Sequence, residues 1–122
     1  MKKQILIVDD SKTMLDMLNC TLDGAGYEVV QAENGQEGLS ALAANNIDVI
    51  ITDINMPVMD GIAFIREVRK NPANKALPIL TLTTESSAEK KNEGREAGAT
   101  GWIVKPFDPT KLLNVIRKVS PF

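Results

Sequence analysis

Four apolar residues run directly into two aspartates near the start of the chain, in the stretch Ile5-Leu6-Ile7-Val8-Asp9-Asp10. A second run of this kind, Val49-Ile50-Ile51-Thr52, stops at Asp53, and two later runs stop at Thr83 and at Lys105. Short apolar runs rich in β-branched residues are typical of strands covered on both faces of a parallel sheet. Since the carboxyl ends of parallel strands lie along one edge, we expect these polar residues to meet there.

The expected meeting point gathers three carboxylates, from Asp9, Asp10 and Asp53, with a hydroxyl and an amine. Crowded carboxylates repel one another unless a hard divalent cation lies between them. A cation held by only a few protein oxygens also keeps positions open for phosphate. The set therefore predicts phosphoryl chemistry on an aspartate.

Strand-like and helix-like segments alternate five times along the chain. The strands are expected at 5–8, 27–32, 48–52, 78–82 and 101–104. The helices are expected around 14–22 with a stop at Gly24 and Gly26, from 35 to about 45, at 60–70, at 87–97, and from Asp108-Pro109 through Val119. The pattern predicts an α/β domain with a doubly wound, five-stranded parallel sheet between helices on both faces, and right-handed crossovers.

Leu39, Leu42 and Ala43 share one face of the second helix. Two other helices carry expectations about burial. The fourth helix is highly charged and contains Gly94, so we expect it to be mostly exposed and comparatively soft. In the first helix, Cys20 is expected to pack as a small apolar residue.

Composition narrows the possible functions. A chain of 122 residues is expected to form one domain, 1–122, around one core. Its formal charge of -2 lacks the excess of basic residues that binding to nucleic acid or an anionic membrane surface would need. The absence of histidine argues against a zinc site. The first apolar run is too short for a signal peptide or a membrane span, so we expect a cytoplasmic protein.

Four motifs resemble the receiver domains of two-component response regulators, and most closely the stand-alone chemotaxis regulators of that family. They are Ile7-Val8-Asp9-Asp10, Asp53-Ile54-Asn55-Met56-Pro57 with Asp60-Gly61, Thr83, and Lys105-Pro106-Phe107. All four occur in order at expected strand ends, and the resemblance spans essentially the whole chain. It implies a flavodoxin-like three-layer architecture with strand order 2-1-3-4-5.

The resemblance assigns Asp53 as the nucleophile that accepts a phosphoryl group from a phosphohistidine of a histidine kinase. It also implies a Mg²⁺ ion bound directly by Asp10, Asp53 and the main-chain carbonyl of Asn55, with Asp9 acting through water. Mg²⁺ suits such a site because it prefers oxygen ligands and keeps several waters. Lys105 is expected to bind the phosphate, and the family implies a cis Lys105-Pro106 bond.

The same resemblance implies residues that change conformation on phosphorylation and residues that set how quickly the phosphate is lost. The Thr83 hydroxyl would move to the phosphoryl group, and Trp102 occupies the position of an aromatic reporter that is more often tyrosine or phenylalanine. The indole either swings inward or stays lodged in place. Asn55 and Glu85 resemble a pair that flanks the attacking water in regulators that lose phosphate quickly; otherwise they are ordinary polar loop residues.

A partner surface is implied on helix four, strand five and helix five, around Trp102. Lys90, Lys91 and Arg95 on helix four either contribute to that surface or form a solvated face. We expect a monomer that signals through a downstream protein target, with a possible phosphatase as a further partner. The chain end at Ser120-Pro121-Phe122 looks natural, although a receiver cut from a longer regulator is the alternative.

Three other functions compete with this one. A phosphorelay intermediate would pass its phosphate to a histidine phosphotransfer protein. A metal-dependent aspartyl phosphatase would need a second aspartate as its general acid and base, and Asn55 at that position cannot transfer a proton. A flavodoxin-like FMN carrier would need a glycine-rich phosphate loop after the first strand, where Asp9-Asp10 would repel phosphate instead.

Overall fold

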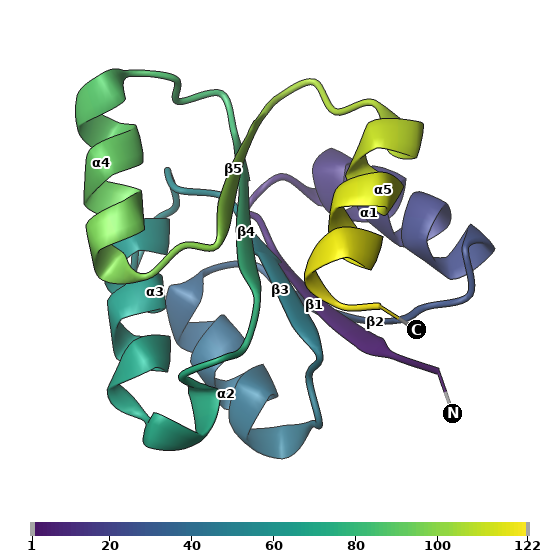
Figure 1. Ribbon diagram of the computed structural model, residues 1–122, viewed down its shortest axis with the longest axis horizontal. Helices are drawn as coiled ribbons and strands as arrows, with labels where there is room; N and C mark the ends of the chain where they lie inside the picture. Colours follow the sequence, from purple (N-terminus) through teal and green to yellow (C-terminus); the bar gives the residue numbers. More distant parts are fainter. Residues whose placement is uncertain (1, 122) are drawn as a thin grey trace.

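The computed structural model describes residues 2–121 and contains one sheet of five parallel strands (Figure 1). The strands are β1 (Gln4–Val8), β2 (Glu28–Ala32), β3 (Val49–Thr52), β4 (Ile79–Thr83) and β5 (Gly101–Val104). The helices are α1 (Lys12–Gly24), α2 (Gly35–Ala44), α3 (Gly61–Lys70), α4 (Ala88–Ala97) and α5 (Pro109–Val119), with a 3₁₀ turn, η1 (Pro72–Asn74). The sheet order is β2-β1-β3-β4-β5, so the predicted fold class and strand order are confirmed.

The sheet lies between two helical layers. Figure 1 shows α1 and α5 over one face and α2, α3 and α4 over the other. Alternate residues of β1 point into different layers: Ile5 and Ile7 pack with α1 and α5, whereas Leu6 and Val8 pack with α3. The central strands are therefore covered on both faces, which explains their continuous apolar runs.

Side-chain caps fix where the helices begin. Ser11, Asn34, Asp60, Ser87 and Asp108 each accept a hydrogen bond from a backbone N–H in the first turn of the following helix. The start of the last helix, expected at Asp108-Pro109, is confirmed, with Asp108 as the cap and Pro109 as the first helical residue. Capping satisfies donors that have no partner within the helix, so it sets the helix start more sharply than apolar periodicity does.

One burial expectation is wrong. Cys20 is exposed, because the buried residues of α1 are Leu15, Leu18 and Leu22 and Cys20 points away from that stripe. In α2, Leu39 and Leu42 pack against the core, whereas Ala43 is exposed. Helix α4 is mostly exposed as expected, with only Gly94 and Ala97 buried.

Arg69 fastens the end of α3 to the end of α4. Its guanidinium donates to the carbonyl of Gly98 at 3.1 and 2.8 Å, and to those of Asn74 and Leu77 at 2.6 Å each. Burial lowers the pKa of the guanidinium from its usual value. These charge-assisted hydrogen bonds hold the carboxyl end of α4 against the body of the protein.

The ends of the chain carry less information. Met1 and Phe122 lie outside the described residues, so the expectation about the Ser120-Pro121-Phe122 ending falls partly outside them too. Within residues 2–121, no helix has the length and apolar character needed to cross a membrane.

Candidate phosphorylation and metal site

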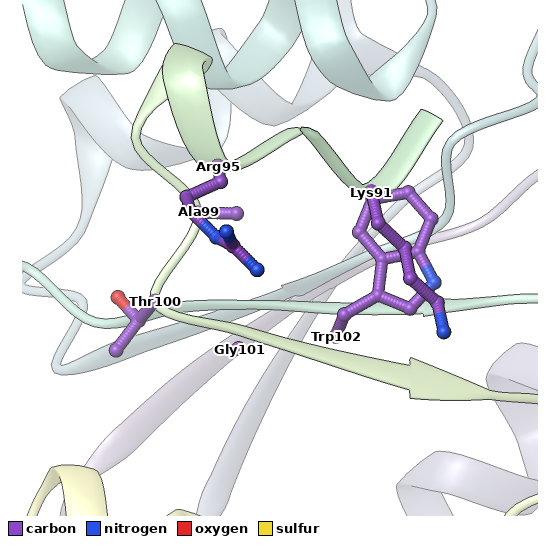
Figure 2. A pocket seen from close by; sticks show the side chains of 6 residues that line it. All are labelled: Lys91, Arg95, Ala99, Thr100, Gly101 and Trp102. Atoms are coloured by element: carbon purple, nitrogen blue, oxygen red, sulfur yellow. The ribbon is translucent and has the colours of Figure 1, made fainter. Parts of the chain in front are cut away.

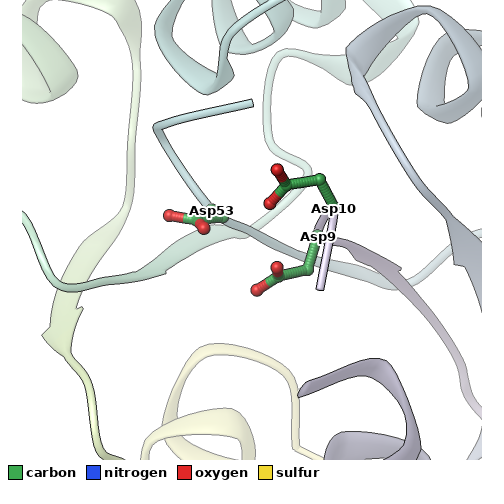
Figure 3. A group of neighbouring side chains, drawn as sticks. All are labelled: Asp9, Asp10 and Asp53. Atoms are coloured by element: carbon green, nitrogen blue, oxygen red, sulfur yellow. The ribbon is translucent and has the colours of Figure 1, made fainter. Parts of the chain in front are cut away.

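Three carboxylates meet at the carboxyl ends of β1 and β3. The strands are adjacent and in register, with Val8 opposite Thr52, so the residues that follow them lie side by side. Carboxylate oxygens of Asp9, Asp10 and Asp53 lie within 4.8 Å of one another (Figure 3). Asp9 and Asp53 are buried and Asp10 is exposed, so the cluster opens to solvent on one side.

Backbone hydrogen bonds hold two of these carboxylates in place. The Asp53 N–H donates to the carbonyl of Val8 at 2.9 Å, which extends the sheet by one residue. Asp53 Oδ1 accepts from the N–H of Ile54 at 2.7 Å, and Asp9 Oδ1 accepts from that of Ser11 at 2.9 Å. In each carboxylate, Oδ1 is thus held by the backbone, and Oδ2 is the atom that meets the ammonium of Lys105.

Lys105 reaches into this cluster from the end of β5. Its Nζ lies 2.8 Å from Asp9 Oδ2 and 3.1 Å from Asp53 Oδ2. Burial by itself would lower the pKa of this ammonium, but its hydrogen bonds to both carboxylates raise the pKa overall. The expected cis bond between Lys105 and Pro106 is confirmed.

The pKa of Asp9 is raised above its usual value in spite of that ion pair. Burial raises its pKa more than the hydrogen bonds from Lys105 and Ser11 lower it, and the nearby charge of Asp53 raises it further. One ammonium thus faces three acidic groups. An arrangement of oxygen donors with excess negative charge and one open side could hold a divalent metal ion.

The loop after β3 bends sharply beside Asp53. The Gly61 N–H donates to the carbonyl of Ile54 at 2.8 Å, and a side chain at Gly61 would collide with the backbone of Asp53 and Ile54. Asn55 is exposed and lines a small polar hollow with Asp60 and other residues of α3 and α4. Its amide side chain has no hydrogen bond to the carboxylates, and only its position after Asp53 places it near the cluster.

Thr83, Glu85 and Trp102 form a second connected group next to the carboxylates. Thr83 is fully buried, and its carbonyl accepts from the Lys105 N–H at 2.8 Å. Its hydroxyl accepts from the N–H of Glu85 at 3.2 Å, and the Glu85 carbonyl accepts from Trp102 Nε1 at 2.9 Å. The Glu85 carboxylate accepts a hydrogen bond from the N–H of Ser87 at 3.3 Å.

The architecture, the acidic cluster and the lysine above it occur together in one known family. The sequence matches the response regulator receiver domain over residues 5–117. The chain belongs to the response regulator receiver family. Its relatives include single-domain chemotaxis regulators, and it is a signalling protein of that type.

Individual receivers match along nearly their full length. The structure of chemotaxis response regulator CheY4 of Vibrio cholerae has a TM-score of 0.91 and 49% identity, covering 98% of this chain and 99% of that chain. Chemotaxis protein CheY1 of Helicobacter pylori is 41% identical over 111 residues, 89% of this chain and 90% of its own. Chemotaxis protein CheY of Pseudomonas aeruginosa is 38% identical and covers 95% of this chain and 94% of its own.

Some residues that shape this receiver site were not anticipated from sequence. The Ser11 N–H that orients Asp9 follows the aspartate pair in the chain, and Ser11 also caps α1 through its side chain. A serine just ahead of a helical pattern is a capping signal that could have located this helix start. The contact of Gly94 with Trp102 joins α4 to β5 and leaves no local sequence signal.

Proposed function

We propose that this receiver accepts a phosphoryl group on Asp53 from a histidine kinase and signals through a change in its partner surface. The observation that supports this most directly is the convergence on Asp53 of two further carboxylates and the ammonium of Lys105. A nucleophile, an oxygen-rich cation site and a fixed positive charge are the groups that phosphoryl transfer requires. The whole chain, 1–122, would act as a single receiver domain.

Asp10 and Asp53, with the main-chain carbonyl of Asn55, would hold a Mg²⁺ ion, and Asp9 would hold it through water. When bound, Mg²⁺ neutralises charge on the oxygens of the transferred group. The Asp53 carboxylate attacks phosphorus in line, the P–N bond of the phosphohistidine breaks, and the imidazole keeps the bonding electron pair. Lys105, already beside Asp53 Oδ2, then pairs with a phosphoryl oxygen.

Thr83 would convert this covalent change into a conformational one. Its hydroxyl now accepts the N–H of Glu85, and turning toward a phosphoryl oxygen would end that hydrogen bond. The loop that follows β4 would then rearrange. Because this loop leads directly into α4, the change reaches the face formed by α4, β5 and α5, where we place the docking site of a downstream target.

The same site would also release the phosphate. Asn55 and Glu85 lie two residues beyond Asp53 and Thr83, on the two loops that border the acidic cluster. In these positions they would flank a water that attacks the aspartyl phosphate. The protein would therefore catalyse its own phosphorylation and dephosphorylation, with a possible phosphatase acting on the same bond. The homology to chemotaxis regulators favours a role in chemotaxis.

A small phosphodonor tests the acceptor assignment without knowledge of the kinase. With acetyl phosphate and Mg²⁺, intact-protein mass spectrometry should show the addition of one phosphoryl group. Asp53→Asn should prevent it, whereas Asp16→Asn, on the exposed face of α1, should not. Labelling of Asp53→Asn to the level of the parent protein would refute the assignment.

A further inference from the structure

Trp102 is held on two sides in the unmodified protein. Its indole N–H donates to the carbonyl of Glu85 at 2.9 Å, which ties the ring to the loop between β4 and α4. Its six-membered ring lies against Gly94 of α4, where an added Cβ would stand 2.6 Å from Cζ3 and 3.1 Å from Cε3. Below the ring, Trp102 packs against the core beneath α4.

The backbone of α4 does not require a glycine at position 94. Glycine is unfavourable inside a helix, and the left-handed residue of this helix is its cap, Gly98. A side chain at position 94 would occupy the space of the indole. Gly94 and Trp102 thus fit each other across two elements.

Helix α4 cannot easily move away from the ring. Its carboxyl end is fastened to α3 through the hydrogen bonds from Arg69 to the Gly98 carbonyl. The Gly98 N–H in turn caps the carbonyls of Gly94 and Arg95. The half of α4 that covers the indole is therefore its anchored half.

We propose that Trp102 is locked inward before Asp53 is modified and stays there afterwards, so that the moving part of the switch is the loop 84–87. The second half of this inference depends on the proposed phosphorylation. Glu85 is the pivot: its N–H loses Thr83 when the hydroxyl turns, while its carbonyl stays bonded to the indole. The cleft of about 310 Å³ that Lys91, Arg95 and Trp102 line is then already formed in the unmodified protein (Figure 2).

Fluorescence tests directly whether Trp102 is held inward before modification, because it is the only tryptophan in the sequence. In unmodified protein, Gly94→Ala should expel the ring, raise the acrylamide quenching constant at least twofold and shift the emission to longer wavelength. Gly24→Ala is the matched control, since a methyl group there meets nothing within 4 Å. An unchanged quenching constant in folded Gly94→Ala would overturn the lock.

Urea unfolding gives a second measure should Gly94→Ala fold poorly. In the parent, the exchange should lower the unfolding midpoint because the methyl group and the ring compete for one space. In Trp102→Phe, which lacks the larger ring system, the same exchange should raise the midpoint because alanine favours a helix. Equal shifts in the two backgrounds would overturn the fit between Gly94 and Trp102.

Beryllium fluoride with Mg²⁺, as a phosphoryl mimic, tests whether Trp102 stays in place after modification while the loop 84–87 moves. The quenching constant of Trp102 should stay the same, while amide hydrogen exchange across 84–87 changes. A twofold or larger change in quenching would refute a stationary indole. Mass spectrometry of acetyl phosphate-treated protein reports modification of Asp53 separately, so failure of the proposed function is distinguished from failure of the lock.

Discussion

Lys105 Nζ lies 3.1 Å from Asp53 Oδ2, although the two residues are 52 positions apart in the chain. The contact spans β4, because Lys105 follows β5 and Asp53 follows β3. The same ammonium also bonds Asp9 Oδ2, so one cation bridges the ends of three strands. A positive charge is thus in place before a phosphoryl group arrives, and it needs little reorganisation to act.

Replacing Lys105 with methionine should slow phosphorylation of Asp53. The side chain keeps a similar length but loses the charge that pairs with the transferred oxygens. We expect a loss of roughly 10²-fold in the labelling rate with acetyl phosphate, as for removal of one preorganised stabilising group. A mass-spectrometric time course measures this. Lys111→Met, on the exposed face of α5, should label like the parent; an unchanged rate in Lys105→Met would contradict the role.

Mg²⁺ should stabilise the folded protein through Asp10. A ligand that binds only the folded state at ten times its dissociation constant adds about 1.4 kcal/mol to the free energy of unfolding. Urea unfolding with and without Mg²⁺ should show this gain in the parent and in Asp16→Asn. It should be largely absent in Asp10→Asn, because one direct oxygen ligand loses its charge. Equal stabilisation of all three proteins would place the metal elsewhere.

The phosphate on Asp53 should be lost within seconds to minutes. Under the proposed function, Asn55 and Glu85 would flank and orient the attacking water. Glu85→Ala should lengthen the half-life severalfold, since its carboxylate would no longer be available, whereas Glu89→Ala on exposed α4 should not. Decay of radiolabelled protein after removal of the donor gives both values. A half-life of many hours in the parent with Mg²⁺ present would argue against this pair.

Much of the fold was predictable because its central strands, β1, β3 and β4, are buried on both faces. Such strands read as short apolar runs, and the residue that ends each run marks the edge where a ligand binds. For this reason the sequence alone predicts that Asp9, Asp53 and Lys105 meet at one edge of the sheet. The strand order, however, came from family resemblance, because the alternation of strands and helices fits other doubly wound orders equally well.

Contacts between distant residues were not predictable in the same way. Cys20 lies in an apolar helical pattern, but its burial depends on where the stripe of α1 meets the sheet. The sequence alone indicates only that Gly94 lowers the helical preference of α4. The contact with Trp102, which leaves no room for a side chain at position 94, is visible only in the folded structure. Both outcomes depend on tertiary packing, which overrides local preference.

Gly61 should be intolerant of alanine although the change adds only a methyl group. That group would collide with the Asp53 carbonyl and stand 2.8 Å from Ile54 Cα, and neither backbone atom can turn aside as a flexible side chain would. We expect a loss of about 3 kcal/mol in the free energy of unfolding. Urea unfolding should show the loss, and slower labelling by acetyl phosphate should accompany it because Asp53 is displaced with the loop.

Gly24→Ala provides the comparison for that prediction. Gly24 ends α1, and an added Cβ there meets nothing within 4 Å. The free energy of unfolding of Gly24→Ala should therefore stay within about 0.5 kcal/mol of the parent value. The two variants carry the same chemical change and differ in what surrounds it. If Gly61→Ala proved as stable and as readily phosphorylated as Gly24→Ala, the close approach of α3 to the phosphorylation loop would have no part in positioning Asp53.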